Sequence, residues 1–251
     1  MIKLVKKDLK LFLGKKQDML LTFVLPIIFI TLFAYVFRET NNTEEGDLIS
    51  LVHAVAGTSV FMLLFSVAGI GGSLLDEKQD GMLKKLLCAP IPPDHILFGK
   101  LVFANIISII QLMVMFVYGW LVFGLDIIHH LPSLLIMIFA IAFACSGLGV
   151  VLASFAKTRQ QVQGFSSIIV LVMSALGGSM IPLMFMPEII QKIAVFTVNY
   201  WGIQGIYDIF WKLLPITDIT FLTRVFVLIG IGIFLNFIAL LMFRRNILKI
   251  V

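Results

Sequence analysis

Three side chains of types that bind metal ions occur close together between Asp126 and His130. Asp126, His129 and His130 supply one carboxylate and two imidazoles, which are ligand types found in zinc sites. They stand in a short polar turn between two long apolar stretches. Groups of this kind are usually simple polar turns, so we interpret the three as a turn and expect no metal.

Ser73 and Ser179 each follow a pair of glycines, as a nucleophilic serine within a membrane could. Such a hydroxyl needs a base to remove its proton. No histidine follows Ser179, and no span after Ser73 offers one, so we interpret both as helix breaks or close packing. The HExxH sequence of zinc proteases is absent as well. The residues therefore predict no enzyme active site.

A phosphate-binding loop is also missing. Gly14-Lys15 and Gly99-Lys100 lack the spaced glycine and the following Ser or Thr of a Walker A sequence. We therefore expect no nucleotide or other cofactor in this chain, and any work that it does must be energised from elsewhere.

The composition is that of an integral membrane protein. Of 251 residues, 60% are apolar and 13% are charged, and the mean hydropathy is +1.08. A soluble domain carries about 25% charged residues. The net charge of +5 could indicate nucleic acid binding, but the placement of the charges explains it as membrane topology, and no nucleic acid is expected.

Six apolar stretches are long enough to cross a bilayer, which takes about 20 residues each. They predict an all-α membrane protein with one domain over residues 1–251. The interiors of these spans contain no Asp, Glu, Lys or Arg, which argues against a carrier driven by protons or sodium ions. The predicted spans are 19–37, 50–75, 101–123, 133–155, 163–183 and 223–243.

The basic residues alternate from one side of these spans to the other. Fifteen of the nineteen Lys and Arg residues lie in the segments on one side. These segments are the N-terminus, the loop between the second and third spans, the loop between the fourth and fifth spans, and the C-terminus. The positive-inside rule then predicts cytoplasmic termini and a cytoplasmic 76–100 loop. Cys88 falls in that loop and Cys145 inside a span, so we expect two free thiols.

Residues 1–17 predict an amphipathic helix on the cytoplasmic membrane surface. Ile2, Val5, Leu9 and Phe12 recur at spacings of three and four, with lysines turned elsewhere. The segment could be a basic topology anchor alone, or it could dock a partner as well.

The loop 76–100 combines charged residues, a short amphipathic helix and a rigid turn. Residues 89–93, APIPP, prevent the helix from continuing, and Asp94 is a candidate N-cap for the helix that enters the third span. A stiff connection of this kind could transmit force from a cytosolic partner to the spans. The alternative is a hairpin that merely lies on lipid.

Residues 184–222 follow helix-breaking glycines and prolines yet remain strongly apolar. We predict short re-entrant helices that enter the outer half of the bilayer and pack against the bundle, where irregular backbone is tolerated.

Two segments resemble the permeases of ATP-binding-cassette exporters of the second type, and among them the drug efflux subunits of the daunorubicin-resistance kind. The first segment shares with the family an acidic-basic pair, a glycine, two leucines, a proline and a Gly-Lys pair. It departs from the family at Met82, where the family commonly has threonine. The second is "GGSMIPLMFMPEIIQKIA" with "YWGIQGIYDI". The resemblance implies that the residues of the first segment couple the permease to an ATPase. These residues are Glu77, Lys78, Gly81, Leu86, Leu87, Pro90, Gly99 and Lys100.

The resemblance implies a multi-pass permease of the bacterial cytoplasmic (inner) membrane. It implies a second permease, identical or not, and two ATPase subunits that bind ATP and Mg²⁺ and dock on the N-terminal helix and the 76–100 helix. ATP-driven closure would then rock the two halves and release the cargo outward.

A substrate path is predicted along the second and fifth spans, where small residues and hydroxyls gather beside aromatic side chains. The same residues could serve only helix packing. The candidates are Thr58, Phe61, Phe65, Ser66, Ser167 and Ser174.

The leading hypothesis is an export subunit for a hydrophobic or amphipathic compound such as a drug, an antibiotic or a lipid-like molecule, with membrane lipid around it. One alternative is export of a polysaccharide or lipid-linked glycan. Another is a membrane anchor or sensor that recruits a cytosolic partner and transports nothing.

Overall fold

The computed structural model describes residues 2–39, 44–88, 92–156 and 158–246, and for residues 38–39, 44–45, 78, 84, 86–87, 93–94 and 243–246 it describes the backbone alone. These ranges are helical almost throughout. In chain order the helices are α1 (Ile2–Gly14), α2 (Lys16–Met19), the π-helical η1 (Leu20–Val24), α3 (Leu25–Glu39), α4 (Glu44–Gln79), α5 (Met82–Cys88), α6 (Pro93–Phe123), α7 (Ile127–Phe155), α8 (Arg159–Leu176), the 3₁₀ helix η2 (Leu183–Phe185), α9 (Glu188–Ala194), α10 (Val198–Phe210) and α11 (Ile219–Asn246).

Within the described residues, five helical stretches are long and apolar enough to cross a membrane: Lys16–Phe37, Gly46–Glu77, His95–Phe123, Ile127–Phe155 and Ile219–Met242. Each contains nearly all of one predicted span. The observed helices begin a few residues earlier than most predicted spans, because a helix continues through polar residues that an apolar stretch excludes. The all-α class and a multi-pass membrane protein are thus confirmed.

Helix α8 covers part of the predicted span 163–183 but is not among those five. It opens with the polar sequence Arg-Gln-Gln-Val-Gln and ends at Leu176, seven residues before the predicted limit. Gly177 and Gly178 end it, and Gly178 has a positive φ of 81°. An 18-residue helix is about 27 Å long, just short of the roughly 30 Å hydrocarbon core. A sixth crossing therefore remains a prediction.

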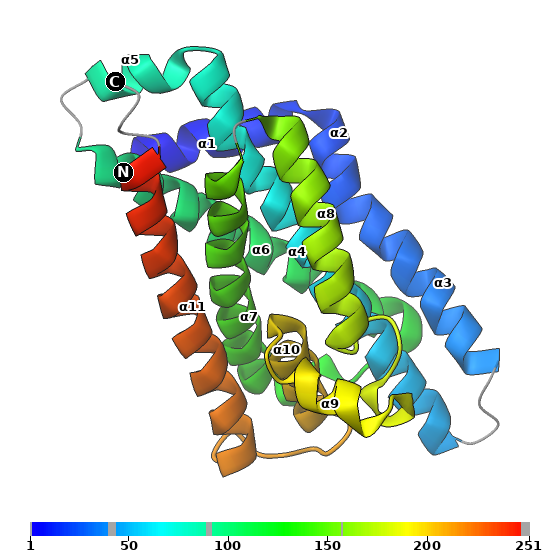
Figure 1. The fold of residues 1–251 in the computed structure, drawn as a ribbon. Coiled ribbons are helices and arrows are strands. Elements are labelled where there is room, and N and C mark those ends of the chain that lie inside the picture. Colours follow the sequence, from blue (N-terminus) through cyan, green and yellow to red (C-terminus); the bar gives the residue numbers. More distant parts are fainter. Residues whose placement is uncertain (1, 40–43, 89–91, 157, 247–251) are drawn as a thin grey trace.

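The long helices run side by side, and two sets of short helices lie at opposite ends of the bundle (Figure 1). Helix α1 lies crosswise at the end that also holds α5, and α9 and α10 lie at the other end. Helix α7 is central and packs against α11, α4 and α6. The end with α1 is the one that the basic residues predict to be cytoplasmic.

Helices α2, η1 and α3 form one continuous stretch from Lys16 to Phe37. Pro26 has no N–H to donate to the carbonyl of Thr22, and the wider π-helical turn at Leu20–Val24 lies directly before it. This long helix leaves α1 at Lys15 and then packs along α4.

The predicted amphipathic pattern of α1 is confirmed in part, because Ile2 at the start of the helix is exposed. Phe12 is buried against Phe103 and Ile107 of α6, and Val5 and Leu9 pack onto the same cluster. The burial of this face fixes α1 across the start of α6. Its location at a membrane surface remains a prediction.

The N-cap expected for the helix that enters the third span is wrong. Helix α6 begins at Pro93 with Pro92 as its N-cap, so Asp94 lies within the first turn. Proline suits the first helical position because its fixed φ is already helical and the missing N–H has no partner there.

The segment between α8 and α11 consists of short helices, as predicted, and α10 is buried among α4, α7 and α11. The fully buried carboxylate of Asp208 lies 2.7 Å from Lys212 Nζ and 3.3 Å from Arg224 Nε. This cluster ties α10 to the start of α11. Re-entry into a bilayer remains a prediction.

Candidate functional site

Four charged side chains from three helices meet where α1 crosses the bundle. Glu77 Oε1 of α4 lies 2.7 Å from Lys7 Nζ of α1 and 3.0 Å from Lys100 Nζ of α6. Asp8 Oδ1 of α1 lies 3.0 Å from the same Lys100 Nζ and 3.2 Å from Lys7 Nζ. We call Lys7, Asp8, Glu77 and Lys100 the ion cluster; it contains two positive and two negative charges.

Most of the ion cluster is shielded from solvent. The side chains of Asp8, Glu77 and Lys100 are only 4%, 9% and 6% exposed. Lys7 is the most accessible member. Burial alone lowers the pKa of Lys7, but the hydrogen bond to Glu77 and the charges of Asp8 and Glu77 outweigh it and raise this pKa above its ordinary value. Lys7 is therefore cationic throughout the physiological pH range.

Small and apolar residues bring the charged groups together. Gly99 precedes Lys100, and a β-carbon placed on Gly99 would lie 3.4 Å from Leu4 Cβ of α1. Leu4 packs on the apolar cluster of Leu97 and Leu101. Helix α1 is thus held down on both sides of Asp8, which directs this carboxylate to Lys100.

The predicted coupling residues are only partly brought together. Glu77 and Lys100 are in direct contact, and Gly99 lies beneath α1. Gly81 forms the turn between α4 and α5 with a φ of 69°. The side chains of Lys78, Leu86 and Leu87, and all of Pro90, lie outside the described residues.

A second ion pair joins the ends of α4 and α8. Arg159 Nη1 donates to Asp76 Oδ2, and both side chains are about one third exposed. Thr158 precedes Arg159 as the N-cap of α8, and its hydroxyl accepts a hydrogen bond from Gln161 N. Helix α4 is therefore tied to α1 and α6 through Glu77 and to α8 through Asp76.

The sequence reasoning missed Lys7, Asp8, Asp76 and Arg159. A signal existed for one of them. Asp8 is four residues from both Leu4 and Phe12, so it lies on the apolar face of α1, where a carboxylate is costly unless it meets a cation. Nothing in the local pattern identifies Lys7 among its neighbouring lysines.

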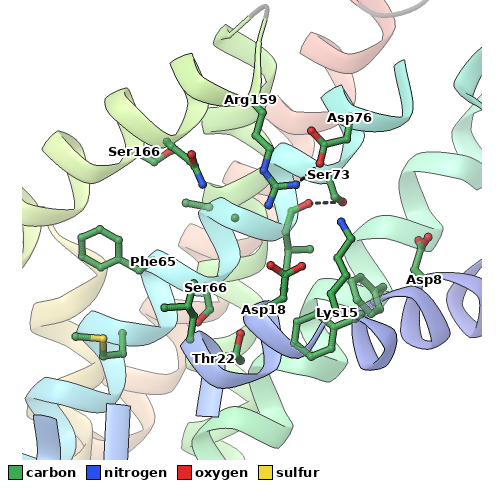
Figure 2. Close-up of a pocket in the computed structure, with 18 of the residues that line it drawn as sticks. Asp8, Lys15, Asp18, Thr22, Phe65, Ser66, Ser73, Asp76, Arg159 and Ser166 are labelled. Atoms are coloured by element: carbon green, nitrogen blue, oxygen red, sulfur yellow. Dashed lines mark hydrogen bonds and ion pairs between the residues drawn. The ribbon is translucent and has the colours of Figure 1, made fainter. Parts of the chain in front are cut away.

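A cavity of about 920 Å³ lies beside the ion cluster, between the N-terminal helices and α8, with α4 along its length. Asp8, Glu77 and Lys100 line it at the end that holds α1. Figure 2 shows Lys15 and Asp18 pointing from the N-terminal helices toward Ser73, Asp76 and Arg159. Farther from α1 the lining is largely apolar: Leu21, Leu25, Phe29, Phe61, Met62, Phe65 and Met180.

Four of the six predicted path residues, Phe61, Phe65, Ser66 and Ser167, line this cavity. The rings of Phe61 and Phe65 are 5.1 Å apart and nearly perpendicular. The other two are not on it. Thr58 is buried, and Ser174 is fully buried and accepts a hydrogen bond from Asn199 Nδ2 at 2.9 Å. That bond gives Ser174 a packing role.

The other chemical candidates are occupied by structural contacts. Ser73 donates to the carbonyl of Ile70 at 2.7 Å, and Ser179 accepts from Asn199 Nδ2 at 2.6 Å. The buried His53, which precedes both serines, has its Nδ1 2.7 Å from the hydroxyl of Tyr207. Neither serine is therefore activated by an imidazole.

The Asp126 turn caps a helix. Asp126 accepts from the backbone N–H of His129 and contacts the His129 ring at 2.7 Å, while the His130 ring packs edge-on against Phe210. Across the described residues no three metal-ligand side chains come together. Cys88 and Cys145 are free thiols, as predicted.

A comparison with protein families identifies the family of this chain. The profile of the ABC-2 type transporter family matches residues 1–211, which include the ion cluster and every described residue that lines the cavity. The chain belongs to the ABC-2 type transporter family. The resemblance drawn from the 76–100 loop is confirmed at this level.

Individual relatives of this ABC-2 chain are distant. It is 24% identical over 196 residues to the linearmycin resistance permease protein LnrN of Bacillus subtilis (strain 168), with 73% of this chain and 48% of LnrN covered. It is 23% identical to the putative transport permease YvfS of the same organism, with 80% and 82% covered. For the inner membrane transport permease YhhJ of Escherichia coli (strain K12) the identity is 25%, with 52% and 35% covered. The chain thus spans about half the length of LnrN and most of YvfS.

Proposed function

We propose that this ABC-2 chain is the transmembrane permease subunit of an exporter that moves a hydrophobic or amphipathic compound outward. Separate ATPase subunits energise it. One observation carries the proposal. Asp8, Glu77 and Lys100 hold α1 against the bundle, and the same three side chains line the cavity. Met82, the first residue of α5, lines the cavity as well. A partner that moves α1 or α5 therefore changes the cavity directly.

The docking surface consists of α1 and the turn after α4. Lys3, Lys6 and Lys10 of α1 are exposed, away from its buried face, and α5 follows Gly81 at the same end of the bundle. We propose that two ATPase subunits bind here on the cytoplasmic side of a bacterial inner membrane, beneath this chain and a second permease. The family supports an ATPase partner, and the name of LnrN, a resistance permease, supports an antibiotic-like cargo.

Copurification and transport test this function together. The tagged chain, purified from membranes of its own cells, is expected to bring down an ABC ATPase and to show no ATP hydrolysis when stripped of it. Reconstituted together, the two are expected to hydrolyse ATP faster when a transported amphiphile is present and to concentrate it inside inverted vesicles. An ATPase that never copurifies, or vesicles that accumulate no tested amphiphile, would favour the non-transporting sensor.

The turn at Gly81 offers a prediction about coupling. A β-carbon there would meet no other atom within 4 Å, but the φ of 69° is unfavourable for side chains other than asparagine and aspartate. We expect Gly81→Val to cost about 1–2 kcal/mol at this turn and to reduce amphiphile-stimulated ATPase activity severalfold. Gly81→Asn, which tolerates this conformation, is the matched control. Equal stimulation in both variants would contradict a role for the turn geometry.

A further inference from the structure

The cavity beside the ion cluster has two chemically different parts. The charged lining residues of its near part lie around the ends of α1, α4 and α8, beside apolar ones such as Phe12 and Phe103. Its far part is mostly aromatic, leucine and methionine side chains with a few hydroxyls such as Ser66. Its volume of about 920 Å³ is at the upper end of ordinary small-molecule sites. An elongated amphiphile fits such a site with its tail in the far part and its head group in the near part.

The near part retains unpaired negative charge. Five of the described residues that line the cavity are carboxylates. Asp8 and Glu77 are in the ion cluster and Asp76 is paired with Arg159. Asp18 and Asp80 form no ion pair with any side chain that the structure describes. Among the described lining residues one unpaired cation stands against them, the exposed Lys15. The unpaired charges of these described residues therefore sum to a negative value.

Two buried acceptors on the cavity wall also lack partners. Glu77 is 7% exposed, and its Oε2 has no hydrogen-bond partner although its Oε1 holds both lysines. Ser166 is 2% exposed, and its Oγ is likewise unpartnered. A buried polar atom left without a partner is costly, so the carboxylate oxygen of Glu77 favours a ligand that brings donors. The Ser166 hydroxyl can either accept or donate.

We propose that this site selects amphiphiles whose head group is a protonated amine over those whose head group is an anion. The inference rests on the proposed export function and narrows its substrate class. A primary ammonium has three donors and no acceptor, which matches the free oxygen of Glu77 and the charge of Asp18. A carboxylate or phosphate head group would instead lie among carboxylates, with one free cation among the described lining residues to meet it.

Two probes that differ only in the head group test the proposal: 11-(dansylamino)undecylamine, which keeps a free amine, and 11-(dansylamino)undecanoic acid. Binding to the full chain in nanodiscs of zwitterionic phosphatidylcholine is followed by dansyl fluorescence at pH 7, with empty nanodiscs subtracted. We expect the amine to bind at least about tenfold more tightly, corresponding to about 1.4 kcal/mol. Equal affinities, tighter binding of the acid, or no saturable binding of either probe would overturn the proposal.

Variants of Asp18 locate the effect. Asp18→Asn is expected to weaken amine binding about fivefold, because a charge-assisted contact is lost, and to leave acid binding nearly unchanged. Asp18→Lys is expected to bring the two affinities together or reverse them. Asp126→Asn, a carboxylate change in the exposed turn before α7, is the matched control and should change neither. If Asp18→Asn behaves like Asp126→Asn, the assignment of the head group to this site is wrong.

These measurements need no ATPase. Failure of the head-group preference would therefore leave the export proposal standing, whereas an ATPase that never copurifies would count against export without affecting the binding result.

Discussion

Gly71→Ala is expected to cost about 3 kcal/mol or more of stability, at the upper end of the range for overpacked cores. Gly71 lies where α4 crosses α7, and an added β-carbon would collide with the backbone carbonyl of Gly149, coming within 2.9 Å of its carbon and 3.1 Å of Ala153 Cβ. The obstacle is backbone in the middle of two long helices, so no side-chain rotation relieves it. The two helices would have to separate.

Gly69→Ala is the matched control for this experiment. Gly69 is two residues away on the same helix, and a β-carbon there meets no atom within 4 Å. Thermal unfolding of both variants in detergent, followed by size-exclusion chromatography, measures the difference. We expect Gly69→Ala to match the wild type because alanine is also the better helix former. Similar melting temperatures for the two variants would show that α4 and α7 do not cross as described.

Glu77→Ala is expected to release α1 from the bundle. Removing this carboxylate leaves Lys7 and Lys100 to share Asp8, so the ion cluster becomes net positive around a lysine that is nearly buried. Breaking a buried pair by removing one partner costs about 3–5 kcal/mol. A loss of 3 kcal/mol corresponds to about a hundredfold rise in the open population.

Trypsin provides the measurement, because α1 contains four lysines and is cut faster when it detaches. Cleavage within α1 in inverted vesicles is expected to accelerate by about that hundredfold factor. The neighbouring Asp76→Ala is the control, since Asp76 pairs with Arg159 of α8 and forms no described ion pair with α1. The double variant Glu77→Ala/Lys100→Met restores neutrality and should recover part of the protection. If all three variants are cut like the wild type, the ion cluster does not hold α1.

The pairing within the ion cluster shows why parts of the site were beyond sequence reasoning. Glu77 and Lys100 are close in sequence and were selected together by resemblance, but Lys7 reaches Glu77 across 70 positions. Six lysines precede the first span, and each has similar neighbours. Only the rotation of α1 about its axis, set by the burial of Phe12 and its neighbours, selects Lys7.

The predicted substrate path shows the same limit. Ser66 and Ser174 are both small hydroxyl residues in apolar stretches, yet Ser66 lines the cavity and Ser174 is fully buried against Asn199. The sequence contains the residue types that such a path needs. It does not contain the direction in which each one points.

Hydrophobic length, basic-residue alternation and helix-breaking residues are local properties, so the sequence by itself determined the all-α class, the position of five membrane-length helices and the family. The tertiary structure decided the rest: which glycines allow helices to touch, which charges meet, and which hydroxyls face the cavity. These depend on how helices rotate and cross, and that is set by contacts between residues far apart in the chain, whose combined burial exceeds any local preference.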